Sequence, residues 1–206
     1  MSYYPANVSY KPLLFIHIPK AAGSSVRAWY KKRYGKFYKS MHGSLNHPVL
    51  KEINKTMHSF TIVRNPYDLV FSWYRYKYSM LEETRHRDPE ELRAWHKGFD
   101  YWLQNYVEKI NLTKDKQGTY NKISPSYNQL SYISTNGKVK VNTILRFESL
   151  DKDWGLINAI CGSEIQLPYQ NKTKVQGDYK TAYTVTSKKI VEQYYKDDLE
   201  FFNYNF

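Results

Sequence analysis

The sequence predicts an α/β fold with a mostly parallel central sheet flanked by helices. A short run of mainly apolar residues extends from Leu13 to Ile18, and a second segment, from Met57 to Val63, is also expected to be a buried strand. Such runs are typical of strands covered on both faces, which is the situation in parallel sheets. A helical pattern follows each run, and strands that are separated by helices favour parallel pairing.

The first run ends in a loop suited to an anion. Pro19 breaks the strand, and Lys20 and three small residues precede a helix expected from Ser24 to about Tyr34, with Gly35 as its stop. Small residues let an anion reach backbone N–H groups, and the helix dipole favours negative charge there. Lys20 adds a mobile positive charge. A tight turn with a solvated lysine is the alternative.

The second run ends at a helix start. Asn65 has the chemistry of an N-cap, Pro66 fits the first helical position, and Asp68 falls where a capping box has its acid. A helix is therefore expected from Pro66 to about Met80. Arg64 then stands at the carboxyl end of a strand, the edge of an open α/β sheet where ligands bind.

The remaining elements follow from turn signals and residue spacing. In chain order we expect a short strand from Lys36 to Ser40, a turn at His42, a helix from Pro48 to Asn54, helices from Asp88 and from Phe99 to Ile110, a loop from Asn111 to Pro125, a hairpin from Tyr132 to Arg146 with a return strand from Val139 to Phe147, a helix from Asp151 to Ile160, a basic loop from Leu167 to Tyr183, and a last helix capped by Thr186 and running to Phe202.

The composition indicates one domain, residues 1–206, with an anionic partner. Lys and Arg number 31 against 19 Asp and Glu, a net charge of +12. The charge alone does not choose among nucleotide, acidic glycan, nucleic acid and anionic lipid. Cys161 is the only cysteine, which excludes an intrachain disulfide and a cysteine-based metal site. No segment has the length of a membrane span, and a cytoplasmic location is expected.

The two strand–helix junctions together resemble a known family. The segment from His17 to Ser25 resembles the 5′-phosphosulfate loop of sulfotransferases that use 3′-phosphoadenosine 5′-phosphosulfate (PAPS), and the segment from Val63 to Tyr74 resembles their 3′-phosphate-binding segment. The segment from Ile144 to Leu150 is similar to a strand-end motif of that family. The segments from Asn171 to Lys174 and from Asp197 to Phe206 resemble the C-terminal part of its carbohydrate sulfotransferase branch. The resemblance implies a P-loop-like fold and PAPS as co-substrate.

The same resemblance implies roles for individual residues. Lys20 would contact the 5′-phosphate and the bridging oxygen, where charge builds during transfer. Arg64 would hold the 3′-phosphate with Ser72, which lies eight residues further on. The other residues expected to bind the nucleotide are Ala21, Ala22, Gly23, Ser24, Ser25, Lys172 and Lys174.

Each of these roles has a structural alternative. Arg64 could instead form a local ion pair with Asp68, contributing roughly 0.3–0.5 kcal/mol. Ser72 could bond back to its own helical turn. The matched spacing in both motifs favours the binding roles.

Sulfuryl transfer to a hydroxyl also needs a general base. His42 lies between the two phosphate motifs, where a histidine of some relatives acts as base, and an imidazole titrates near neutrality. A loop histidine bonded to backbone is an equally good interpretation. Glu148 is a second candidate, although a structural partner is the better interpretation for it. No metal is expected, because the lysine already supplies positive charge.

Two other functions compete with sulfuryl transfer. A small-molecule kinase is disfavoured because Lys20 precedes the glycine of its loop, whereas the Walker lysine follows one. A basic glycan- or nucleic-acid-binding module would not explain two phosphate motifs. The expected partner is a hydroxyl-bearing acceptor, a saccharide or glycolipid, and no nucleic acid is expected.

Overall fold

A three-stranded parallel sheet forms the centre of the computed structural model, which describes residues 11–35, 48–82, 89–107, 128–170 and 178–206. Its strands are β1 (Leu13–Ile16), β2 (His58–Val63) and β5 (Thr143–Arg146), in the order β1-β2-β5 with both pairs parallel. The expected α/β class and parallel sheet are therefore confirmed. The expected strand from Lys36 to Ser40 and loop from Asn111 to Pro125 lie outside the described residues.

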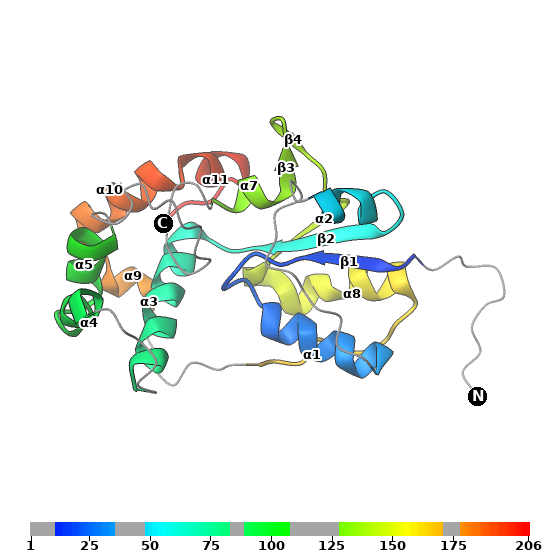
Figure 1. Cartoon of the computed structure of the whole chain (residues 1–206), viewed down its shortest axis with the longest axis horizontal. Helices are drawn as coiled ribbons and strands as arrows, with labels where there is room; N and C mark the ends of the chain where they lie inside the picture. Colours follow the sequence, from blue (N-terminus) through cyan, green and yellow to red (C-terminus); the bar gives the residue numbers. More distant parts are fainter. Residues whose placement is uncertain (1–10, 36–47, 83–88, 108–127, 171–177) are drawn as a thin grey trace.

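The main core lies between the sheet and two helices on one face. Figure 1 shows α1 (Gly23–Tyr34) and α8 (Leu150–Cys161) side by side there, with α2 (Pro48–Ile53) on the other side of the sheet. Trp29 of α1 meets Trp154 of α8 edge to face, with ring centroids 5.3 Å apart. Both indoles are buried, and Trp154 also packs on Phe60 of β2. This core holds the ends of β1 and β2 in a fixed relation.

A second group of helices lies beyond the carboxyl end of β2 (Figure 1). It contains α3 (Pro66–Glu82), α4 (Pro89–His96), α5 (Phe99–Trp102), the π-helical turn η1 (Leu103–Val107), α9 (Tyr179–Ala182) and α10 (Val185–Tyr194). Its core is separate from the sheet core and largely aromatic, with Phe71 packed edge to face on Phe99. Because α3 starts directly after β2, this group presents α3 at the edge of the sheet.

The expected hairpin is smaller than the sequence indicates. It consists only of β3 (Ser134–Thr135) and β4 (Lys138–Val139), joined by Asn136 and Gly137 with φ of 52° and 70°. The preceding residues form α7 (Gln129–Ile133) instead of a strand. The expected return strand is divided into β4 and β5 (Thr143–Arg146). Beyond the hairpin, the side chain of Asn142 accepts the Ser59 N–H, and β5 then pairs with β2. This is a long-range pairing that no local turn signal reports.

The helices in the last third of the chain also differ from the prediction. The last helix begins after Thr184, which forms a capping box with Ser187, and Thr186 is not its cap. The expected single helix is interrupted at Tyr195, and a separate helix, α11 (Lys196–Phe201), follows. The region expected to be a loop up to Tyr183 contains α9, and a short η3 (Phe147–Ser149) precedes α8. Over the described ranges, none of the helices has the length and apolar character needed to cross a membrane.

Candidate functional site

The loop between β1 and α1 has an unusual backbone. Lys20 and Ala22 both have positive φ, 66° and 58°, although neither is glycine. A left-handed residue with a Cβ costs roughly 1–2 kcal/mol and persists only where its surroundings require it. Ala22 is the N-cap of α1, whose first N–H groups have no acceptor within the helix. The loop therefore offers backbone donors at its helical end.

Gly23 is required by a close approach of His17. A Cβ built on Gly23 would lie 1.7 Å from Nε2 of His17. The His17 ring is buried and stacks on Phe15 of β1, with centroids 5.4 Å apart. Gly23 therefore leaves space for the buried ring of His17. The sequence had predicted only that the small residues of this loop leave space for a ligand.

Lys20 lies on an aromatic surface of α3. Its Nζ is 3.9 Å from the ring centre of Tyr76 and 5.9 Å from that of Trp73. Burial, and then the charges of Arg64 and Arg75, lower the pKa of Lys20 to about 8. Three cationic groups therefore gather at the carboxyl edge of the sheet.

Arg75 is a further cationic residue of this site that its sequence motifs did not predict. It lies three residues after Ser72 on α3, and residues at this spacing share a helix face. Burial and then the charge of Arg64 lower the pKa of Arg75, which places it beside the second phosphate motif. The helical spacing from Ser72 was the signal that could have found it.

Arg64 connects the two segments that were expected to bind phosphate. Its Nη1 donates to the Lys20 carbonyl at 2.9 Å, and its Nε donates to Oδ2 of Asp68 at 2.8 Å. Its guanidinium lies over the Phe147 ring, 4.1 Å from the ring centre. The local pair with Asp68 is thus present, and Asp68 takes this role in place of the expected capping box. The two hydrogen bonds use only part of the guanidinium's donor set, so they are compatible with anion binding.

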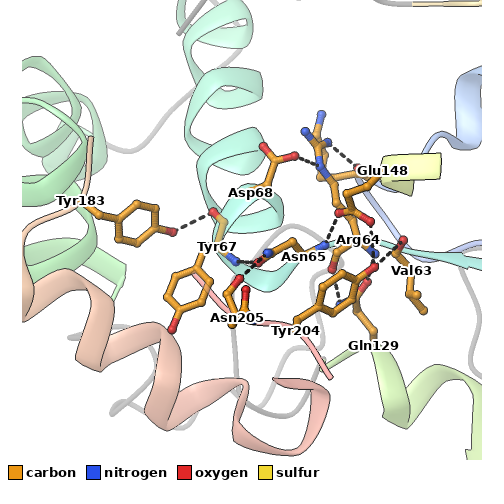
Figure 2. Close-up of polar contacts among 11 residues, drawn as sticks. Val63, Arg64, Asn65, Tyr67, Asp68, Gln129, Glu148, Tyr183, Tyr204 and Asn205 are labelled. Carbon is orange, nitrogen blue, oxygen red and sulfur yellow. Dashed lines mark hydrogen bonds and ion pairs between the residues drawn. The ribbon is translucent and has the colours of Figure 1, made fainter. Parts of the chain in front are cut away.

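Residues distant in sequence surround the junction of β2 and α3 (Figure 2). The side chain of Asn65 caps α3 as expected, accepting the N–H of Tyr67 at 3.1 Å. The Asn65 N–H donates to Oε1 of Glu148 at 2.7 Å, and Oε2 of Glu148 accepts the Tyr204 hydroxyl at 2.9 Å. Glu148 therefore has a structural position, with a main-chain N–H and a tyrosine as its partners.

The other expected site residues are only partly placed. The Oγ of Ser25 accepts the Gln170 N–H at 3.2 Å, which ties the segment before residue 171 to α1. Its contact to a phosphate stays a prediction, as do those of Ala21, Ala22, Gly23, Ser24 and Ser72. His42, Lys172 and Lys174 lie outside the described residues.

Comparison with known proteins gives one match. A family model described as the sulfotransferase family matches residues 8–205, nearly the whole chain. No curated protein and no solved structure matches the chain. Among the residues with described positions, no group of His, Cys, Asp and Glu side chains has the arrangement needed to hold a metal ion.

Replacing Gly23 by alanine tests the close approach of His17. We expect Gly23→Ala to lower the free energy of unfolding by about 1–3 kcal/mol, because the new methyl group overlaps a buried ring. Gly155→Ala is the matched control: it lies in α8 with nothing within 4 Å of its added Cβ, and should raise stability by roughly 0.5–1 kcal/mol. Urea unfolding measures both, and similar changes in the two variants would contradict the clash.

Proposed function

This chain belongs to the sulfotransferase family, enzymes that use PAPS as the sulfuryl donor, and from that premise we propose that it transfers the sulfuryl group to a hydroxyl of a carbohydrate. The observation that carries the proposal is the hydrogen bond from Arg64 to the Lys20 carbonyl. It brings the two expected phosphate motifs together within one domain, residues 1–206.

The chemistry of the donor fits the residues gathered here. PAPS carries anionic groups at two separate positions, the 5′-phosphosulfate and the 3′-phosphate, so its binder needs two cationic points. Lys20 and Arg64 supply one cationic point at each strand end, and Arg75 adds a third positive charge near them. At the start of α1 the first backbone N–H groups have no acceptor within the helix, and Gly23 has no side chain.

The proposed roles follow from this fit. Lys20, with the backbone from Ala21 to Ser25, would hold the 5′-phosphate. Arg64 would hold the 3′-phosphate as a planar fork, with Ser72 adding a hydroxyl from α3. Lys172 and Lys174 are proposed to bind the nucleotide as well.

The donor supplies an activated sulfuryl group, and the chain's residues would stabilise its transfer. The acceptor oxygen bonds to sulfur as the bond from sulfur to the bridging oxygen breaks, which yields a sulfate ester and 3′-phosphoadenosine 5′-phosphate (PAP). Lys20 would stabilise the negative charge that builds on the leaving oxygen. His42 would accept the hydroxyl proton. No metal is part of the proposed step.

A carbohydrate acceptor is supported by the surface near Lys20. Tyr76 and Tyr169 are exposed, at 36% and 77%, and exposed aromatic rings can pack against sugar faces. Tyr169 is among the groups that influence the pKa of Arg75, so the two side chains lie near each other. The excess of Lys and Arg suits an acidic saccharide or the headgroup of a glycolipid.

A thermal-shift experiment separates the proposed function from its two rivals. We expect PAP without Mg²⁺ to raise the Tm by several degrees, because a ligand that binds only the folded state stabilises it. Stabilisation by ATP with Mg²⁺ and not by PAP would indicate a kinase. Stabilisation by an oligonucleotide alone would indicate a binding module.

The charge on Lys20 should control the alkaline limb of activity. With a pKa of about 8, Lys20 is protonated below that pH and loses its charge above it, so kcat/KM for PAPS should fall as pH rises through about 8. Lys20→Arg keeps the charge and should move this fall to higher pH. Lys20→Ala should lower kcat by roughly 10²–10³ near pH 7, where the wild-type lysine is charged, and this difference from wild type should shrink above pH 8. If the fall of kcat/KM at alkaline pH were unchanged in Lys20→Arg, it would arise from the titration of another group.

The assignment of His42 as base is tested separately. We expect His42→Ala to lower kcat by roughly 10²–10⁴ with little change in the Kd for PAP, because general-base catalysis acts on the acceptor hydroxyl. His47→Ala is a control from the same stretch of sequence and should leave both quantities near the wild-type values. Full activity of His42→Ala at saturating acceptor would exclude this role.

A further inference from the structure

Gln129 at the start of α7 is fully buried and holds the main chain of Arg64. Its Oε1 accepts the Arg64 N–H at 2.8 Å, and its Nε2 donates to the Arg64 carbonyl at 2.8 Å. Figure 2 shows the amide of Gln129 beside this residue. A single side chain thus satisfies both main-chain groups of Arg64.

The position of Arg64 explains why such a partner is needed. The pairing between β2 and β5 ends at Val63 and Arg146, so Arg64 is the first residue beyond the ladder. Its N–H and carbonyl would otherwise need partners from water or another strand. The side-chain amide of Gln129 makes the two hydrogen bonds that a neighbouring strand would otherwise make to the main chain of Arg64.

Asp198 of α11 holds Gln129 in turn. Its Oδ2 accepts the main-chain N–H of Gln129 at 2.7 Å and lies 3.3 Å from Nε2, and its Oδ1 accepts the Leu130 N–H at 2.8 Å. Asp198 is fully buried, and burial raises its pKa to about 6, so that it still carries its charge at neutral pH. A charged carboxylate with N–H donors around it gives Gln129 a single orientation.

We infer that Gln129, secured by Asp198, is a positioning residue that sets the orientation of Arg64 for the 3′-phosphate. The inference rests on the proposed function, in which Arg64 binds that phosphate. A guanidinium binds a phosphate through a planar fork, so its affinity depends on direction as well as distance. Asp68 and the Lys20 carbonyl orient the guanidinium of Arg64, and Gln129 holds the main chain from which that side chain extends.

The discriminating measurement is the ratio of affinities for PAP and for 5′-AMP, which lacks the 3′-phosphate. Methionine is similar in size to glutamine but lacks the amide. We expect Gln129→Met to raise the Kd for PAP roughly tenfold, the usual effect of losing a buried hydrogen bond or two. The affinity for 5′-AMP should stay near the wild-type value. Isothermal titration calorimetry gives both constants. A residue with only a structural role would weaken both ligands equally, and that result would overturn the inference.

Thr61→Val is the matched control. Thr61 is fully buried in β2, and its Oγ1 donates to the Ile16 carbonyl at 2.8 Å, so the variant also loses a buried hydrogen bond. It does not contact Arg64. We expect both affinities to change by less than about twofold, as for sites without shared partners. A fall in the ratio as large as that in Gln129→Met would contradict the inference.

Arg64→Ala separates failure of the inference from failure of the proposed function. If the wild-type chain does not prefer PAP to 5′-AMP, or if Arg64→Ala leaves the preference intact, the proposed role of Arg64 is wrong. If Arg64→Ala removes the preference and Gln129→Met keeps it, only the inference is wrong. Should Gln129→Met not fold, Asp198→Asn replaces it: a lowered ratio supports the inference, and an unchanged ratio overturns it.

Discussion

The candidate site depends on the hydrogen bond from the Arg64 guanidinium to the Lys20 carbonyl. These residues follow two neighbouring parallel strands, and the bond fixes the end of one strand to the end of the other. Parallel strands bring their carboxyl ends to one edge, so two segments more than forty residues apart form one surface. The left-handed backbone of Lys20 serves the same contact, because Lys20 directs its carbonyl to Arg64 and its side chain to α3.

A gathering of cations at one edge is costly without an anion. The charges of Arg64 and Arg75 both act against the protonated form of Lys20, as does burial, which is the largest cause of its lowered pKa. The ring of Tyr76 offsets part of that cost, because the π face attracts a cation. Such an arrangement is what a binder of a bisphosphorylated nucleotide needs, and it agrees with the family to which the chain belongs.

The C-terminal half of the chain stabilises the site from outside. The main chain and the cap of the junction between β2 and α3 are bonded by three residues from separate parts of the chain, Glu148, Asn205 and Gln129. Buried polar groups that are fully bonded hold a single geometry, because any displacement leaves a donor or acceptor without a partner. The junction is therefore rigid at the point where a phosphate is expected.

The sequence by itself determined the two strands and the helix starts that form the candidate site, and it supplied the hypothesis for the chemistry of that site. The apolar runs predicted β1 and β2, Asn65 and Pro66 predicted the start of α3, and Lys20 and Arg64 were recognised because their motifs are local. The tertiary structure alone decided the pairing of β5 with β2 and the contacts of Gln129 and Glu148 with the junction. The physical reason is that these contacts join residues far apart in sequence, where neither helical spacing nor turn chemistry carries information about which groups meet.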